Sequence, residues 1–143
     1  MTKNAAELVT PLTYKTLSKN PVSIDLFAET AEWRPEHISL AERGDLMVIA
    51  PATANIIAKI AHGIADDALS STVLAFKGKK IIAPSMNTAM LGNCVTQENI
   101  SILKQRNFVI IDPEDGELAC GKMGTGRLAP IERIVDKIQN SLK

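Results

Sequence analysis

The sequence predicts an α/β fold with a parallel sheet between layers of helices. Three apolar runs lack the polar–apolar alternation of a half-exposed strand, which is typical of parallel strands covered on both faces. They span Asp45–Ala50, Lys80–Ala83 and Phe108–Ile111. Segments with helical periodicity lie between them, and this order implies right-handed crossovers. In such sheets, ligands bind at the carboxyl ends of the strands.

Each remaining element is predicted from apolar spacing and capping residues. The first helix is expected from about Ala5 to Leu17, capped by Thr2 or Asn4, with Leu8, Leu12 and Leu17 on its inner side. A short extended piece, Val22–Leu26, follows it. Further helices are expected over His37–Arg43 (ended by Gly44), Ala54–Ala61, Ala65–Phe76, Thr96–Arg106 (after Asn93) and Ile131–Leu142 (after Pro130).

Composition favours a single globular domain in the cytoplasm. The 143 residues suit one domain, and 16 Lys and Arg balance 16 Asp and Glu. No net charge therefore attracts the chain to nucleic acid or anionic lipid. The sequence shows no signal-like start and no apolar run near about 18 residues. Two cysteines and two distant histidines give neither a disulfide framework nor a metal spacing.

Two of the loops expected at the strand ends, Pro51–Asn55 and Pro84–Met90, offer hydrogen-bonding groups. In the first, Thr53 either caps the following helix or binds a ligand with Asn55, helped by the N–H groups of the helix start. In the second, Asn87 either caps a turn or offers its amide to a carboxylate. Met90 taken alone is typical of core filling.

The third loop, Asp112–Arg127, is the most informative. Its glycines predict a mobile flap rather than a regular element. Cys120, in its middle, is either inert or an exposed thiol that exchanges a proton with a substrate. Cys94 is expected to be inert. His37, at a helix start, is a candidate general base, whereas His62 at a helix end is expected to be structural.

Four segments, in order, resemble the homo-oligomeric flavin-containing cysteine decarboxylases. They are PEHISLA around His37, APATANIIAKIAHGIADDALSS from Ala50, APSMNTAM from Ala83 and GELACGKMGTGR from Gly116. The resemblance implies a three-layer Rossmann-like flavoprotein fold over residues 1–143, with FMN as cofactor. It places Thr53, Ala54 and Asn55 on the isoalloxazine side, Ser85 close to the ring, and Thr2 at a strand end that contacts the cofactor.

The resemblance also implies catalytic roles. His37 would serve the oxidative half of the reaction, Asn87 with Met90 would hold the substrate carboxylate, and Cys120 would supply a proton in the final reductive step. Family members that stop at the enethiol on a peptide lack such a cysteine. The implied activity is therefore FMN-dependent decarboxylation of 4′-phosphopantothenoylcysteine to 4′-phosphopantetheine in coenzyme A biosynthesis, by thiol oxidation, decarboxylation and re-reduction.

Two departures from the family pattern are visible. Leu91 stands where the motif Pro-x-Met-Asn-x-x-Met-Trp has tryptophan, which loses packing area in the second loop. The chain also opens on what reads as the end of a strand, so a first strand–helix unit of about 30 residues, which binds the FMN phosphate in the family, is expected to be missing.

The resemblance implies partners too, and two other functions remain open. It implies a homotrimer, in some members a dodecamer, and a separate phosphopantothenate–cysteine ligase. One alternative is a non-catalytic regulatory or scaffold subunit of the same fold. The other is a different flavin enzyme, either a peptidyl-cysteine decarboxylase or a flavin prenyltransferase.

Overall fold

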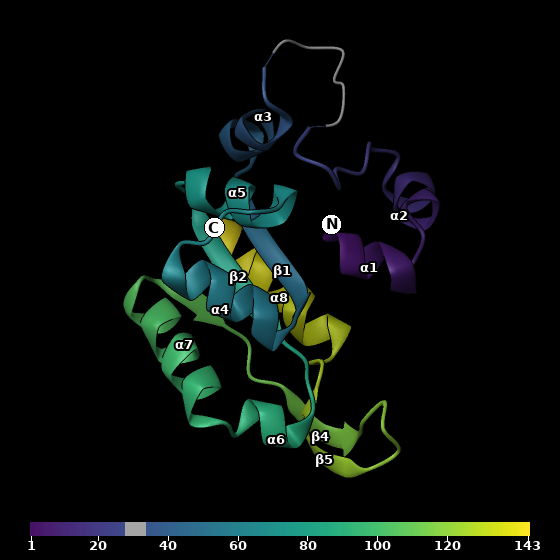
Figure 1. The fold of residues 1–143 in the computed structure, drawn as a ribbon, viewed down its shortest axis with the longest axis vertical. Helices are drawn as coiled ribbons and strands as arrows, with labels where there is room; N and C mark the ends of the chain where they lie inside the picture. The colour runs from purple at the N-terminus through teal and green to yellow at the C-terminus, as the bar shows by residue number, and fades with distance from the viewer. Residues whose placement is uncertain (28–33) are drawn as a thin grey trace. The chain divides into compact units, whose positions relative to one another are not determined.

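The computed structural model describes residues 1–27 and 34–143 and divides into two compact units (Figure 1). One comprises Met1–Arg43 and Gly63–Phe76, and the other comprises Gly44–His62 and Lys77–Lys143. The single domain expected from the sequence stays a prediction. In the described part of the chain, no helix is long and apolar enough to cross a membrane.

The second unit is built on the predicted parallel sheet. Its strands β1 (Leu46–Ala52), β2 (Lys79–Pro84) and β3 (Phe108–Ile110) pair in parallel in the order β1-β2-β3. All three apolar runs therefore form the strands expected of them. The remaining elements are α4 (Ala54–His62), α6 (Thr88–Leu91), α7 (Cys94–Gln105), β4 (Glu114–Glu117), β5 (Met123–Arg127) and α8 (Ile131–Leu142).

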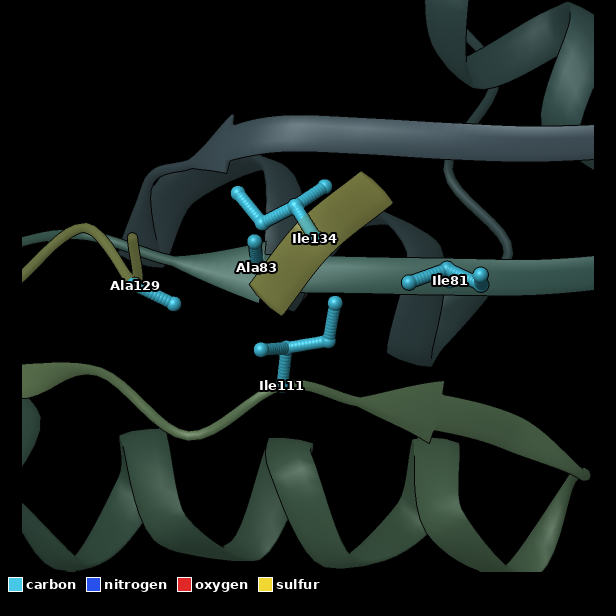
Figure 2. Close-up of a cluster of buried hydrophobic side chains, with 5 residues drawn as sticks. All are labelled: Ile81, Ala83, Ile111, Ala129 and Ile134. Atoms are coloured by element: carbon cyan, nitrogen blue, oxygen red, sulfur yellow. The ribbon is translucent and has the colours of Figure 1, made fainter. Parts of the chain in front are cut away.

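Helices cover this sheet on both faces, which confirms the predicted fold class. Ile81 and Ala83 of β2 pack in one buried cluster with Ile134 of α8, and Figure 2 shows α8 crossing β2 at these side chains. Ile82 points to the opposite face because side chains alternate along a strand. Figure 1 shows α4 on the side of the sheet away from α8. Ile57 of α4 and Leu103 of α7 are fully buried.

The first unit contains α1 (Lys3–Leu8), α2 (Pro11–Ser18), α3 (Glu36–Arg43) and α5 (Ala68–Ala75). The predicted helix from Ala5 to Leu17 is wrong, because the chain breaks after Leu8 and restarts at Pro11, where proline suits the first helical position. The break shifts the helical phase, and Leu8, Leu12 and Leu17 are 87%, 68% and 78% exposed. The inner face predicted for them is therefore also wrong.

Capping residues define the helix starts in this unit. The Thr2 hydroxyl accepts a hydrogen bond from the Ala5 amide at 3.1 Å, so Thr2 rather than Asn4 is the cap of α1. Asp67 and Ser70 form a reciprocal capping box, which starts α5 at Ala68 rather than Ala65. The segment Val22–Leu26 forms no strand in the described chain.

Candidate active site

The first two predicted loops lie side by side at the carboxyl edge of the sheet. Ala52 at the end of β1 pairs with Pro84 at the end of β2, and the Ser85 amide donates to the Ala52 carbonyl at 3.0 Å. Thr53 and Ser85 therefore follow directly on two adjacent strand ends. This is the edge where ligands bind in sheets of this kind.

The junction between β1 and α4 offers hydrogen-bond donors at its surface. The Thr53 hydroxyl accepts from the Ile56 amide at 3.3 Å, which confirms its capping role. Thr53 and Asn55 are both exposed. The first turn of any helix leaves N–H groups without intrahelical acceptors, so these groups are available to an acceptor-rich ligand.

Asn87 is oriented by its own helix. It is the cap of α6, and its Oδ1 accepts from the Ala89 amide at 2.8 Å. This bond leaves the Nδ2 group free to donate elsewhere. Nδ2 donates a hydrogen bond to the Cys120 Sγ at 3.8 Å. The capping interpretation is thus confirmed, and the same cap aims the amide at Cys120.

The region around Cys120 is a β-hairpin, so the prediction that it forms no regular element is wrong. β4 and β5 pair antiparallel, with Glu117 opposite Met123, and residues 118–122 alone form the turn. The turn is closed by a bond from the Leu118 amide to the Lys122 carbonyl at 2.9 Å, and Gly121 adopts a φ of +75°. Cys120 is exposed at this tip, as predicted.

Two glycines allow the hairpin to approach the loop that bears Asn87. The Met86 amide donates to the Gly126 carbonyl at 2.9 Å, and the Ser85 hydroxyl donates to the same oxygen at 3.3 Å. A Cβ atom on Gly126 would overlap the Met86 carbonyl oxygen, and one on Gly124 would overlap the Thr88 hydroxyl. Close approach of two backbones, rather than flexibility, is what these glycines provide.

Sequence reasoning missed these contacts, and it missed Thr88 as a site residue. The sequence carries no local signal for these contacts, because a glycine is compatible both with a flexible backbone and with a close approach. Met90, exposed on α6, lies three residues after Asn87. Its contact with a substrate stays a prediction.

His37 presents a polar atom without a partner. It is the second residue of α3, in the first unit, and its Nδ1 atom is buried with no hydrogen-bond partner among the described residues. A buried polar atom left unpaired is costly, so this nitrogen calls for a partner that the described residues do not supply. His37 and Thr2 both belong to the first unit, and their place beside Asn87 and Cys120 stays a prediction.

His62 and Cys94 are the histidine and the cysteine that were expected to take no part in catalysis. His62 Nε2 and Asn99 Oδ1 share a hydrogen bond of 2.9 Å between α4 and α7. Cys94 is a free, exposed thiol at the first position of α7. Across residues 1–27 and 34–143, no group of three or more His, Cys, Asp and Glu side chains could hold a metal ion.

Leu91, the residue that departs from the family motif, borders a cavity of about 210 Å³. We expect Leu91→Trp to fill part of this space and to raise the melting temperature by about 3 °C, equivalent to about 1 kcal/mol. Thermal unfolding followed by circular dichroism measures this. Val95→Trp, at an exposed position on the neighbouring helix, is the matched control. A lower melting temperature for Leu91→Trp alone would show that the cavity cannot take the ring.

The fold and the site define a class of protein. The family model of the flavoproteins matches residues 1–143, and the chain belongs to this family. It is 42% identical to the probable phosphopantothenoylcysteine decarboxylase of Streptococcus mutans over 144 residues, covering 99% of this chain and 80% of the relative. It is 45% identical to the coenzyme A biosynthesis bifunctional protein CoaBC of Bacillus subtilis, covering 94% of this chain and 33% of that protein.

Solved structures give the same class. The FMN-dependent cysteine decarboxylase SpaF has a TM-score of 0.85 at 34% identity, covering 99% of this chain and 75% of that one. A PPC decarboxylase mutant complexed with pantothenoylaminoethenethiol has a TM-score of 0.75 at 30% identity, covering 80% of this chain and 64% of that one. The fold is therefore that of flavin-dependent decarboxylases, as the sequence motifs predicted.

The residues present fit a flavin. The isoalloxazine ring carries carbonyl oxygens and ring nitrogens, which call for hydrogen-bond donors. The first turn of α4 exposes such N–H groups, next to the strand end that leads into Ser85. Together with family membership, this donor set supports a flavin cofactor.

Proposed function

We propose that this chain is an FMN-dependent decarboxylase that converts 4′-phosphopantothenoylcysteine to 4′-phosphopantetheine in coenzyme A biosynthesis. The observation that carries the proposal is the pairing of Asn87 Nδ2 with Cys120 Sγ at 3.8 Å. A fixed amide donor suits a carboxylate, and a thiol beside it suits delivery of a proton to the carbon that loses that carboxylate. The resemblance to the Streptococcus mutans protein and to the PPC decarboxylase complex supports the choice of substrate.

The net reaction exchanges a carboxylate for a proton and is redox-neutral. The bond between the carboxylate and its carbon breaks, carbon dioxide leaves, and that carbon gains a hydrogen. Bound FMN supplies the reversible two-electron oxidation of the thiol-bearing carbon that makes this cleavage feasible. Asn87, helped by Met90, orients the carboxylate, and Cys120 donates the proton when the two electrons return to the product.

The cofactor would be held at the carboxyl edge of the sheet. Thr53, Ala54 and Asn55 provide the start of α4, and Ser85 begins the adjacent loop. Thr2 and His37, from the first unit, complete the proposed contacts. Retention of FMN by the purified chain after desalting tests whether these residues suffice to hold the cofactor.

A second candidate is decarboxylation of a cysteine at the end of a peptide. The similarity to the peptidyl-cysteine decarboxylase EpiD, with a TM-score of 0.77 at 25% identity, favours this class. The flap cysteine separates the two candidates, because only a reaction that proceeds to the saturated thiol requires a proton donor there. Cys120, exposed at the hairpin tip and 3.8 Å from Asn87, therefore favours the coenzyme A substrate.

Two steps test the proposed function. The purified 143-residue chain is mixed with FMN and desalted, and its absorbance is recorded between about 350 and 500 nm, the range of oxidised flavin bands. Retained, shifted bands are expected. The flavin-loaded protein is then given 4′-phosphopantothenoylcysteine or a peptide ending in cysteine. Turnover of the peptide alone would select the second candidate, and flavin retention without either turnover would indicate a scaffold subunit.

We also propose a cytoplasmic homotrimer, or a dodecamer built from such trimers, with a phosphopantothenate–cysteine ligase activity as functional partner. Several apolar side chains on the first unit are largely exposed, among them Leu8, Leu17 and Phe27. Large exposed apolar side chains are candidates for a surface covered in an assembly where they form a patch. Light scattering on the purified chain measures the mass, and a monomer would contradict the proposed assembly.

His37→Asn is expected to abolish substrate-dependent bleaching of the flavin bands. Asparagine cannot act as a proton acceptor as imidazole does, so the oxidative half of the reaction fails, with a loss of about 100-fold or more. Anaerobic absorbance after addition of substrate measures the bleaching. His62→Asn, which changes the other histidine, is the control and should bleach normally. Normal bleaching in His37→Asn would remove His37 from the mechanism.

A further inference from the structure

We propose that Thr88 is a positioning residue that, through Gly124, fixes the Cys120 thiol beside Asn87. The inference rests on the proposed function for its catalytic consequence. Thr88 begins α6, directly after Asn87, and α6 contacts β5. A Cβ atom built on Gly124 would overlap the Thr88 Oγ1 and lie 3.5 Å from the Thr88 Cβ. The hydroxyl therefore occupies the space that any side chain at Gly124 would need.

This contact is the second of two that hold the hairpin. The first is made by backbone alone, from the Met86 amide to the Gly126 carbonyl at 2.9 Å. Cβ atoms built on Gly124 and on Gly126 both meet the loop that bears Asn87, so both contacts face this loop. Two contacts in succession restrict both sliding of β5 along this loop and tilting of β5 away from it.

The rest of the hairpin transmits this position to Cys120. Met123 pairs with Glu117 at the base of the turn, and Thr125 Oγ1 donates to Asp115 Oδ1 across the two strands. The tip, residues 118–122, is closed by its own backbone bonds. On the other side, the Ala89 amide fixes Asn87 Oδ1. Both ends of the 3.8 Å Asn87–Cys120 contact are thus tied to elements that meet at Thr88 and Gly124.

Proton delivery is sensitive to such placement. A group displaced by about 1 Å from its productive geometry costs on the order of 100-fold in rate. Displacing the hairpin moves Cys120 but leaves Asn87 on α6. The step that uses Cys120 should therefore suffer more than the loss of carbon dioxide, whereas a merely structural defect would lower both in proportion.

The test is a pair of reciprocal substitutions in the 143-residue chain. Gly124→Ala introduces a methyl group where Thr88 Oγ1 lies, and Thr88→Ala removes that oxygen while keeping a Cβ at ordinary contact distance. Hydrogen exchange of the Met86 amide, followed by NMR, reports whether the hairpin stays in contact, without flavin or substrate. We expect exchange about tenfold faster or more in Gly124→Ala and near-parental exchange in the double variant.

Two further variants serve as controls for the exchange measurement. Thr88→Ser keeps the hydroxyl and should match the parent protein. Gly92→Ala adds a methyl group beside α6 at 3.4 Å from the Thr88 carbonyl, with a helical φ, and should leave Met86 exchange unchanged. Unchanged exchange in Gly124→Ala, or no recovery in the double variant, would overturn the proposed contact.

The catalytic consequence is measured as a ratio of products. In the flavin-loaded protein, Gly124→Ala should lower formation of the final thiol relative to carbon dioxide release, and the double variant should restore the ratio. Equal loss of both products would overturn the positioning role even if exchange behaves as expected. A parent protein that releases no carbon dioxide would refute the proposed function instead, and amide exchange would still decide the contact.

Discussion

Replacing Cys120 by serine is expected to abolish formation of the final thiol while carbon dioxide release persists and the enethiol product accumulates. The serine hydroxyl is nearly the same size and can occupy the same exposed position at the tip of the hairpin. It is a much weaker acid than a thiol, so it cannot deliver the proton that completes the reaction. Loss of a positioned general acid costs about 100- to 10,000-fold.

The measurement separates the two half-reactions. Carbon dioxide release is followed alongside chromatography of the products, with the parent and the variant at equal flavin content. Cys94→Ser is the control, since Cys94 is also exposed but lies at the start of α7. Equal loss of carbon dioxide release and final thiol in Cys120→Ser would contradict the proposed role of Cys120.

The sheet was predictable because its signal is local. Each of the three strands contains a continuous apolar run. The central strand, β2, lies between β1 and β3, and its side chains from Ile81 onward are buried on both faces. The loops at the strand ends follow from the same topology. Thr53 and Ser85 lie on adjacent strand ends because β1 and β2 are neighbours, which the strand order decides.

The first helix was mispredicted because its signals compete. Apolar residues recur at helical spacing from Leu8 to Leu17, but Pro11 interrupts the backbone hydrogen bonds and is favoured only at a helix start. Burial is decided by what packs against a face, and periodicity cannot supply that partner. The exposure of Leu8 and Leu17 therefore lay outside what spacing alone can predict.

Candidate site residues can be chosen from the sequence, whereas the contacts between them cannot. Asn87 and Cys120 are 33 positions apart, and their roles came from resemblance, not from spacing. The hairpin that carries Cys120 was missed because a glycine can indicate either a flexible backbone or room for a close neighbour. Gly124 and Gly126 serve the second, and only tertiary contacts with Thr88 and Met86 reveal it.

Gly126→Ala is expected to detach the hairpin from the Asn87 loop. Gly126 has a φ of +145°, and its Cβ would overlap the backbone oxygen of Met86, which no rotation of a side chain can relieve. Backbone strain and overpacking together should cost about 3 kcal/mol or more at this contact. The Met86–Gly126 hydrogen bond would break, and Cys120 would lose its fixed distance to Asn87.

Limited trypsin digestion measures this detachment, because Lys122 lies in the tip and Arg127 at the end of β5. A local cost of about 3 kcal/mol should speed cleavage at these two sites by about a hundredfold, since proteolysis follows the population of the open form. Gly63→Ala is the matched control: its φ is also positive, but nothing lies within 4 Å of the added atom. Faster cleavage after Lys122 in that control would point to a general loss of stability. Cleavage of Gly126→Ala at the parental rate would show that the hairpin holds its place without the Met86 contact, and the fixed Asn87–Cys120 geometry would need another cause.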